Sequence, residues 1–72
     1  MKVIGTDSLG KIIKQRRKEL NYTQAFLAEF SGLSVSFLSD LENGKKTCEI
    51  GKVLRVVNLL GMDCLLTRRG EE

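Results

Sequence analysis

Apolar residues recur every three or four positions in four segments of the chain, which is the spacing of an amphipathic helix face. The segments predict helices from about Ser8 to Leu20, from Thr23 to Phe30 or Ser31, from Ser34 to Asn43 and from Cys48 to about Leu60. The predicted core-facing residues are Leu9, Ile12, Ile13, Leu20, Phe26, Leu27, Phe30, Phe37, Leu38, Leu41, Ile50, Val53, Leu54, Val57 and Leu60. A mainly helical fold is therefore expected.

The ends of these segments carry residues that commonly start and stop helices. The predicted N-caps are Asp7 or Ser8, Thr23, Ser34 and Thr47. Such side chains can accept hydrogen bonds from N–H groups that the first helical turn leaves unpaired. The predicted stops are Asn21, Gly32, Asn43-Gly44 and Gly61. Glycine suits a stop because it tolerates the left-handed backbone conformation found at many helix ends.

The tail after Gly61 has the composition of a β-strand, predicted over 62–68. Met62, Cys64 and Leu66 would lie on one side and Leu65 on the other. A lone strand leaves backbone groups unpaired, so it needs a partner. The same strand of a second subunit is one candidate, and Val3-Ile4 of the same chain is the other. We favour the dimer, in which Val56 and Leu59, surplus to one small core, would pack under the strands.

Length and charge limit the classes of function. With 72 residues we expect one domain whose modest core would gain from dimerisation. No segment resembles a signal peptide or membrane span, which places the chain in the cytoplasm. The net charge is +3, and the basic residues cluster. The clusters are Lys11, Lys14, Arg16, Arg17 and Lys18, then Lys45 and Lys46, then Arg68 and Arg69. Such clusters suit nucleic acid, but a net charge of this size alone favours the simpler explanation of a solvated helix face.

The chain offers little chemistry for an enzyme or a metal centre. It has two cysteines, Cys48 and Cys64, and no histidine, so a zinc site lacks ligands. We expect both cysteines to be small core residues, with Cys48 in the first turn of the fourth helix. Paired catalytic carboxylates and a phosphate-binding glycine loop are also missing from the sequence. We therefore expect neither catalysis nor a cofactor.

The second and third predicted helices, separated by a tight turn at Gly32, form a helix-turn-helix arrangement. In such an arrangement the second helix of the pair enters the DNA major groove. The outward residues of this helix would be Ser34, Val35, Ser36, Ser39 and Asp40. Serine hydroxyls can donate to or accept from base edges, and valine can contact a thymine methyl group. Gln24, Asn43, Lys45 and Lys46 flank the pair and are predicted to contact phosphates.

The stretch Thr23-Gln24-Ala25-x-Leu27-Ala28, Gly32, then Leu38-x-x-Leu41-Glu42-Asn43-Gly44-Lys45 resembles the phage-repressor-type helix-turn-helix family of the Cro/C1 or Xre class. The resemblance covers about Leu9 to Leu60. It implies a lambda-repressor-like domain of four to five helices over 1–72, with a core at 8–60 and a C-terminal dimerisation strand at 62–68. The tail also resembles that of HipB-like antitoxins, in which such strands pair across the dimer.

The resemblance implies a role for each matching residue. Ala28 would be the small residue at the helix contact, and Gln24 would bind phosphate and brace the third helix. Arg17 and Glu42 would form a structural ion pair. Ser34, Val35, Ser36, Ser39 and Asp40 would face bases or nearby phosphates, and Asn43 and Lys45 would contact the backbone. The family often carries Gln, Arg or Asn on this helix, so the serines here leave the operator sequence open.

These observations predict a homodimeric transcriptional repressor that binds a palindromic operator in double-stranded DNA, associated with the bacterial nucleoid when bound. The finer hypothesis is a HipB-like antitoxin that represses its own toxin-antitoxin operon and binds a HipA-like kinase toxin. The alternatives are a stand-alone phage or mobile-element regulator of the Xre type, and a protein-binding module of the same fold without DNA affinity. The sparse base-reading chemistry and Asp40 motivate the last alternative.

Overall fold

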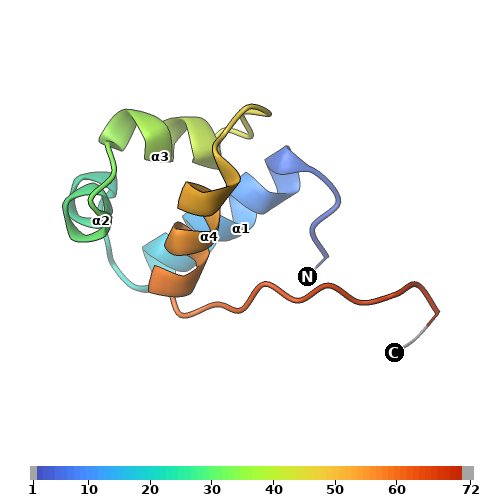
Figure 1. The fold of residues 1–72 in the computed structure, drawn as a ribbon. Helices are drawn as coiled ribbons and strands as arrows, with labels where there is room; N and C mark the ends of the chain where they lie inside the picture. The colour runs from blue at the N-terminus through green and yellow to red at the C-terminus, as the bar shows by residue number, and fades with distance from the viewer. Residues whose placement is uncertain (1, 71–72) are drawn as a thin grey trace.

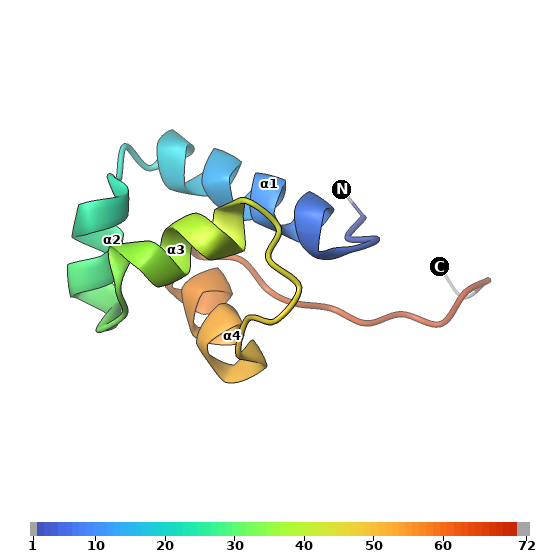
Figure 2. The same ribbon diagram turned by 90° about the horizontal axis from the view of Figure 1, so that it is seen from above.

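The computed structural model describes residues 2–70 and contains four α-helices. These are α1 (Thr6–Glu19), α2 (Gln24–Ser31), α3 (Val35–Glu42) and α4 (Ile50–Leu59). Figures 1 and 2 show α2 and α3 joined by a short turn, and in the view of Figure 1 α1 and α4 lie below α3. None of the helices in this part of the chain has the length and apolar character needed to cross a membrane.

All four helices end in the same hydrogen-bonded turn. Asn21, Gly32, Gly44 and Gly61 have positive φ angles of 60°, 75°, 84° and 74°. After α3, for example, the N–H of Gly44 donates to the Leu41 carbonyl and the N–H of Lys45 to the Asp40 carbonyl, at 3.1 and 3.0 Å. This double closure is the Schellman motif, which pairs carbonyls that a helix end would leave unsatisfied. The stops predicted from the sequence are confirmed.

Two of the four predicted N-caps are present. The hydroxyl of Thr23 accepts from the N–H of Phe26, and that of Ser34 accepts from the N–H of Phe37, both at 3.0 Å. These bonds fix where α2 and α3 begin. The two short central helices are therefore closed at both ends by residues that the sequence pattern identifies.

The predicted starts of α1 and α4 are wrong. The N-cap of α1 is Gly5, and Ser8 lies inside the helix, where its hydroxyl accepts from the N–H groups of Ile4 and Gly5. α4 begins at Ile50 after Glu49, so Cys48 belongs to the preceding loop. Residues 45–49 form the loop that connects the end of α3 to the start of α4. The length of this loop depends on how far apart the two helix ends lie, which local sequence preferences do not indicate.

The core is formed by residues from all four helices. Its buried apolar members are Ile13, Leu27, Ala28, Leu38, Leu41, Val53, Val56, Val57 and Leu60. Partly buried residues, among them Leu9, Tyr22, Phe37 and Cys48, pack around them. Gly10 lets α1 approach α3 closely, because a Cβ atom there would lie 2.4 Å from the Leu41 carbonyl oxygen.

Several predicted core residues face solvent instead. Phe26, Phe30, Ile50 and Leu54 are exposed, with Phe30 at 58% and Ile50 at 65%. Val56 was predicted to lie outside the core and to pack under a dimer strand. It is instead completely buried in the core of its own chain. The periodicity of apolar residues shows that a helix has an apolar face, but it does not fix which residues of that face point directly into the core. On α4 the buried arc is centred on Val53, Val56, Val57 and Leu60.

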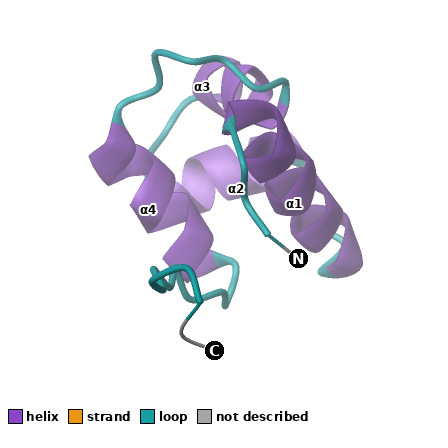
Figure 3. Ribbon diagram, turned by 90° about the vertical axis from the view of Figure 1, so that its right-hand side faces the viewer, coloured by secondary structure: helices purple, strands orange, loops and turns teal. Residues whose placement is uncertain are grey.

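The tail extends away from the helices (Figures 1 and 2) and is loop throughout its described part (Figure 3). Within residues 2–70 there is no strand, so the tail does not pair with Val3-Ile4 of its own chain. Leu65 and Leu66 are exposed at 81% and 94%. Cys64 is exposed too, so its predicted place in the core is wrong. Among residues 2–70, no other part of the chain covers these side chains.

Candidate nucleic-acid interface

The turn between α2 and α3 is built from small residues. The N–H of Leu33 donates to the Ala28 carbonyl at 3.0 Å, across the left-handed Gly32. Ser31 is buried; its hydroxyl donates to the Ala28 carbonyl and accepts from the N–H of Leu33. Arg55 of α4 donates to the Ser31 carbonyl at 3.3 Å. These bonds hold α3 at a fixed angle to α2.

The outer face of α3 presents small side chains. Leu38 and Leu41 are buried, whereas Ser34, Val35 and Ser36 are exposed. Ser39 and Asp40, one turn further along, are half-buried. Figure 2 shows α3 at the front of the molecule, with no other helix covering it. A helix with this surface can approach a groove closely, and its hydroxyls can donate or accept.

A buried ion pair joins α1 to the end of α3. Arg17 Nε lies 2.6 Å from Glu42 Oε2, and Arg17 Nη2 lies 2.9 Å from Glu42 Oε1. The third guanidinium nitrogen, Nη1, donates to the Tyr22 carbonyl at 2.7 Å. Both side chains are buried, and two parallel hydrogen bonds are the strongest geometry available to such a pair. This is the ion pair that the family resemblance implies.

Gln24 is tied into the same cluster. Its Nε2 donates to Glu42 Oε1 at 3.1 Å, so the glutamine braces the end of α3 from the first turn of α2. Burial alone would raise the pKa of Glu42, but hydrogen bonds from Arg17 and Gln24 outweigh it and the pKa is lowered. The hydrogen bond to Glu42 raises the pKa of Arg17. The cluster therefore keeps both charges.

The residues after α3 are already engaged with its last turn. Lys45 Nζ lies 3.3 Å from Asp40 Oδ2, in addition to the backbone bond between these two residues. Asn43 Nδ2 lies 3.5 Å from the Ser39 hydroxyl. The Thr6 hydroxyl donates to the Gly44 carbonyl at 2.8 Å and anchors this loop to the start of α1. Lys46 is exposed.

The structure therefore connects the predicted residues through a network of hydrogen bonds around α3. This network includes Gln24 and the loop 43–46. The Asp40–Lys45 pair was missed by sequence reasoning, although opposite charges five residues apart across a helix stop could have signalled it. The anchoring role of Thr6 left no signal, because its partner Gly44 lies far along the chain. No three His, Cys, Asp or Glu side chains within residues 2–70 gather as metal ligands.

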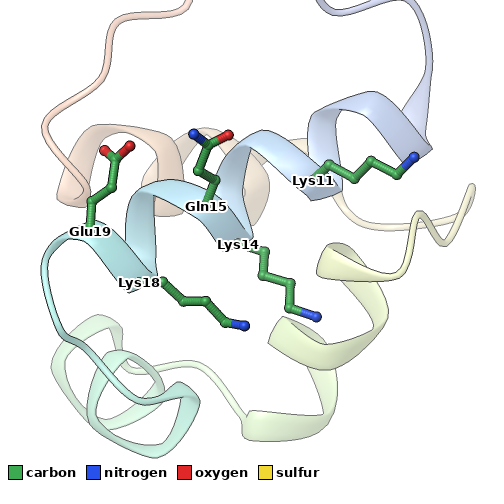
Figure 4. Close-up of a pocket in the computed structure, with 5 residues that line it drawn as sticks. All are labelled: Lys11, Lys14, Gln15, Lys18 and Glu19. Carbon is green, nitrogen blue, oxygen red and sulfur yellow. The ribbon is translucent and has the colours of Figure 1, made fainter.

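A shallow hollow lies along the surface of α1 (Figure 4). It is lined by Lys11, Lys14, Gln15, Lys18 and Glu19. Lys14 and Lys18 extend from one side of the helix, and Gln15 and Glu19 from the other (Figure 4). The sequence indicated a basic cluster here without assigning any of these lysines to a site.

Comparison with known sequences identifies related proteins. The helix-turn-helix family pattern matches residues 13–65. The uncharacterized HTH-type transcriptional regulator y4mF of Sinorhizobium fredii (strain NBRC 101917 / NGR234) is 41% identical over 63 residues, which cover 88% of this chain and 83% of that protein. The ImmF control region 10 kDa protein of Bacillus phage phi105 is 36% identical over 55 residues, covering 76% of this chain and 61% of the phage protein.

Solved structures with the same fold include complexes of HipB. One, described as "HipB-O4 20mer complex", has a TM-score of 0.86 at 20% identity, over 96% of this chain and 97% of that one. Another, "Structure of HipA-HipB-O2-O3 complex", has a TM-score of 0.87 at 20% identity, with the same coverage of the two chains. At these identities the similarity concerns the fold.

Proposed function

Because the chain belongs to the helix-turn-helix family, we propose that it is a sequence-specific transcriptional repressor that binds double-stranded DNA. The observation that carries this proposal is the exposed outer face of α3, held by the buried Arg17–Glu42 pair. A rigid helix with small polar side chains fits the major groove. The y4mF relative, named as an HTH-type transcriptional regulator, supports the regulatory role.

In this proposal the recognition surface has two parts. Ser34, Val35, Ser36, Ser39 and Asp40 face base edges or nearby phosphates. Gln24, Asn43, Lys45 and Lys46 contact phosphates on both sides of the groove and fix the position of α3. Single hydroxyls discriminate less than bidentate side chains, so DNA shape and half-site spacing supply part of the specificity.

The proposed active form is a homodimer on a palindromic operator. Two copies of α3 related by a two-fold axis would reach half-sites about 34 Å apart. The exposed Leu65 and Leu66 support a dimer, since the described part of the chain leaves both side chains open to solvent. The proposed contact surface comprises Leu59, Met62, Cys64, Leu65 and Leu66, with the tails pairing as strands. Val56 is no longer part of it, because its own core buries it.

The finer proposal is a HipB-like antitoxin that represses its own operon and binds a HipA-like kinase toxin. The fold shared with HipB, including in a structure described as a HipA-HipB complex, supports it. The phi105 ImmF control region relative favours a second candidate, a stand-alone phage or mobile-element regulator. Both candidates use the same DNA surface and would act in the cytoplasm. They differ in whether a toxin gene adjoins the repressor gene.

Selection of bound sequences from random 30-base-pair duplexes tests the proposal. Enrichment of an inverted repeat by the intact chain, with a changed consensus for Ser36→Ala or Ser39→Ala, is the expected result. Enrichment that leaves the consensus unchanged in both variants would remove these serines from the recognition set. Failure to enrich any sequence would favour the protein-binding module.

A further inference from the structure

Three lysines form a row along one side of α1. Lys11, Lys14 and Lys18 are separated by three and four residues, which places their side chains near one another on the helix surface. All three are exposed. From Lys11 to Lys18 the row is about 10 Å long, at 1.5 Å of rise per residue.

The ammonium groups of this row are available to a ligand. Among residues 2–70, the row makes no ion pair or hydrogen bond, whereas the neighbouring arginines are engaged. Arg16 pairs with Glu19 at 3.4 Å and donates to the Leu60 carbonyl, and Arg17 pairs with Glu42. Three adjacent positive charges repel one another, and none of them is held in an ion pair within residues 2–70. A polyanion would relieve this repulsion.

The shape of the site limits the kind of anion. Every side chain that lines the hollow comes from α1, so no second wall can enclose a small molecule. An extended chain of anionic groups can instead lie along the row. A DNA strand carries phosphates in series along its backbone, so a row about 10 Å long can contact more than one phosphate of the same strand.

The row adjoins the proposed DNA surface. Lys14 and Lys18 extend from the side of α1 that faces α2 and α3 (Figure 4). In keeping with this placement, the positive charge of Lys14 helps to lower the pKa of Glu42 at the end of α3. Glu42 also accepts the hydrogen bond from Gln24, at the first turn of α2. Because Arg17 already neutralises Glu42, the charge of Lys14 stays available for a phosphate. The row thus continues the line of phosphate contacts that begins at Gln24.

We propose that Lys14 and Lys18, with Lys11 at the end of the row, bind phosphates of the DNA strand that passes the start of α2. This inference rests on the proposed DNA-binding function and adds a second helix to the contact surface. Such contacts would anchor the protein on any sequence, since phosphates carry no base identity. They also compensate for the few strong base contacts available on α3.

The test compares Lys14→Ala/Lys18→Ala with Lys14→Arg/Lys18→Arg on a random-sequence 20-base-pair duplex. The slope of log K against log salt should be smaller by about 1.8 in the alanine variant, at about 0.9 for each lost phosphate contact. At 100 mM salt its affinity should fall by about ten-fold or more. The arginine variant keeps the charge and should keep the slope. Equal melting temperatures would verify that both variants fold.

Separate controls distinguish the inference from the function on which it rests. If the alanine variant keeps the wild-type slope while Lys45→Ala/Lys46→Ala lowers it, the lysine row is not on the DNA but the function stands. If the wild-type chain shows no salt-dependent binding, both fail. Poly-glutamate serves as a second probe. Loss of poly-glutamate binding in the alanine variant with an unchanged DNA slope would assign the row to an acidic protein partner and overturn the inference.

Discussion

Arg17 of α1 and Glu42 at the end of α3 form a buried pair with two hydrogen bonds of 2.6 and 2.9 Å. The pair connects the helix that carries the lysine row to the helix that would contact bases. Gln24 adds a third hydrogen bond to the same carboxylate. Three hydrogen bonds therefore converge on one carboxylate, which links the end of α3 to α1 and α2.

Replacing this carboxylate should be costly. Glu42→Gln leaves the Arg17 charge buried without its counter-ion, and such losses cost about 3–5 kcal/mol of unfolding free energy. Urea denaturation would measure the change. The matched control is Glu19→Gln, which breaks an exposed pair with Arg16 and should cost less than about 1 kcal/mol. Equal effects of the two substitutions would contradict a structural role for the buried pair.

The lowered pKa of Glu42 predicts how stability depends on pH. Its ordinary value is 4.5, and the folded value is lower, so the unfolded state binds the proton first as pH falls. The stabilisation is complete above about pH 5 to 6 and is lost as pH falls below 4.5 through the folded pKa. In Glu42→Gln the loss of unfolding free energy that comes from protonating this carboxylate at low pH should be absent. If the unfolding free energy of Glu42→Gln fell with pH below 4.5 as steeply as that of the wild type, the assignment would be contradicted.

Two glycines should respond in opposite ways to alanine. At Gly10 the added Cβ would meet backbone oxygens of Leu41 and Glu42 at 2.4 and 2.7 Å, so overpacking should cost at least about 1–3 kcal/mol. At Gly51, in the first turn of α4, nothing lies within 4 Å of the added Cβ, and helix propensity should stabilise the chain by up to about 1 kcal/mol. Thermal unfolding of both variants checks the pair. Stabilisation by Gly10→Ala would mean that α1 and α3 are further apart.

The ion pair with Asp40 should lower the affinity of Lys45 for DNA phosphates, and so weaken nonspecific DNA binding. An exposed pair is worth up to about 1 kcal/mol, so Asp40→Asn should tighten binding to random duplex by about two- to five-fold. In a Lys45→Ala background the gain should shrink, because the released ammonium is missing. Anisotropy titrations of the four combinations give the coupling. An equal gain in both backgrounds would show that Asp40 acts by repelling phosphates alone.

The tail should determine the oligomeric state. A chain ending at Asp63 keeps Met62, which packs on the core, and removes the exposed Leu65 and Leu66. Light scattering should report a dimer for the intact chain and a monomer for the truncated one, both with helical circular dichroism. Leu65→Ser/Leu66→Ser should weaken the dimer without shortening the backbone. A truncated chain that remains dimeric would exclude the strand-pairing interface.

Local features of the fold were predictable because they depend on a few adjacent residues. Thr23 and Ser34 as caps, and Gly32 as the stop between α2 and α3, follow from backbone chemistry. The Arg17–Glu42 pair followed from the family resemblance. Val56 and Phe30 were misplaced because periodicity leaves the rotation of a helix about its axis uncertain. Gly10 gave no signal, because its role depends on an approach by a helix distant in sequence.

A salt series of binding most directly tests whether this chain is a DNA-binding regulator. The purified chain would be titrated with DNA from upstream of its own gene and with a scrambled duplex of equal composition. We predict tighter binding to the upstream DNA and a steep loss of affinity as salt rises, with a shallower slope for Lys45→Ala/Lys46→Ala. Affinity that is weak, independent of salt and equal for both duplexes would contradict the account.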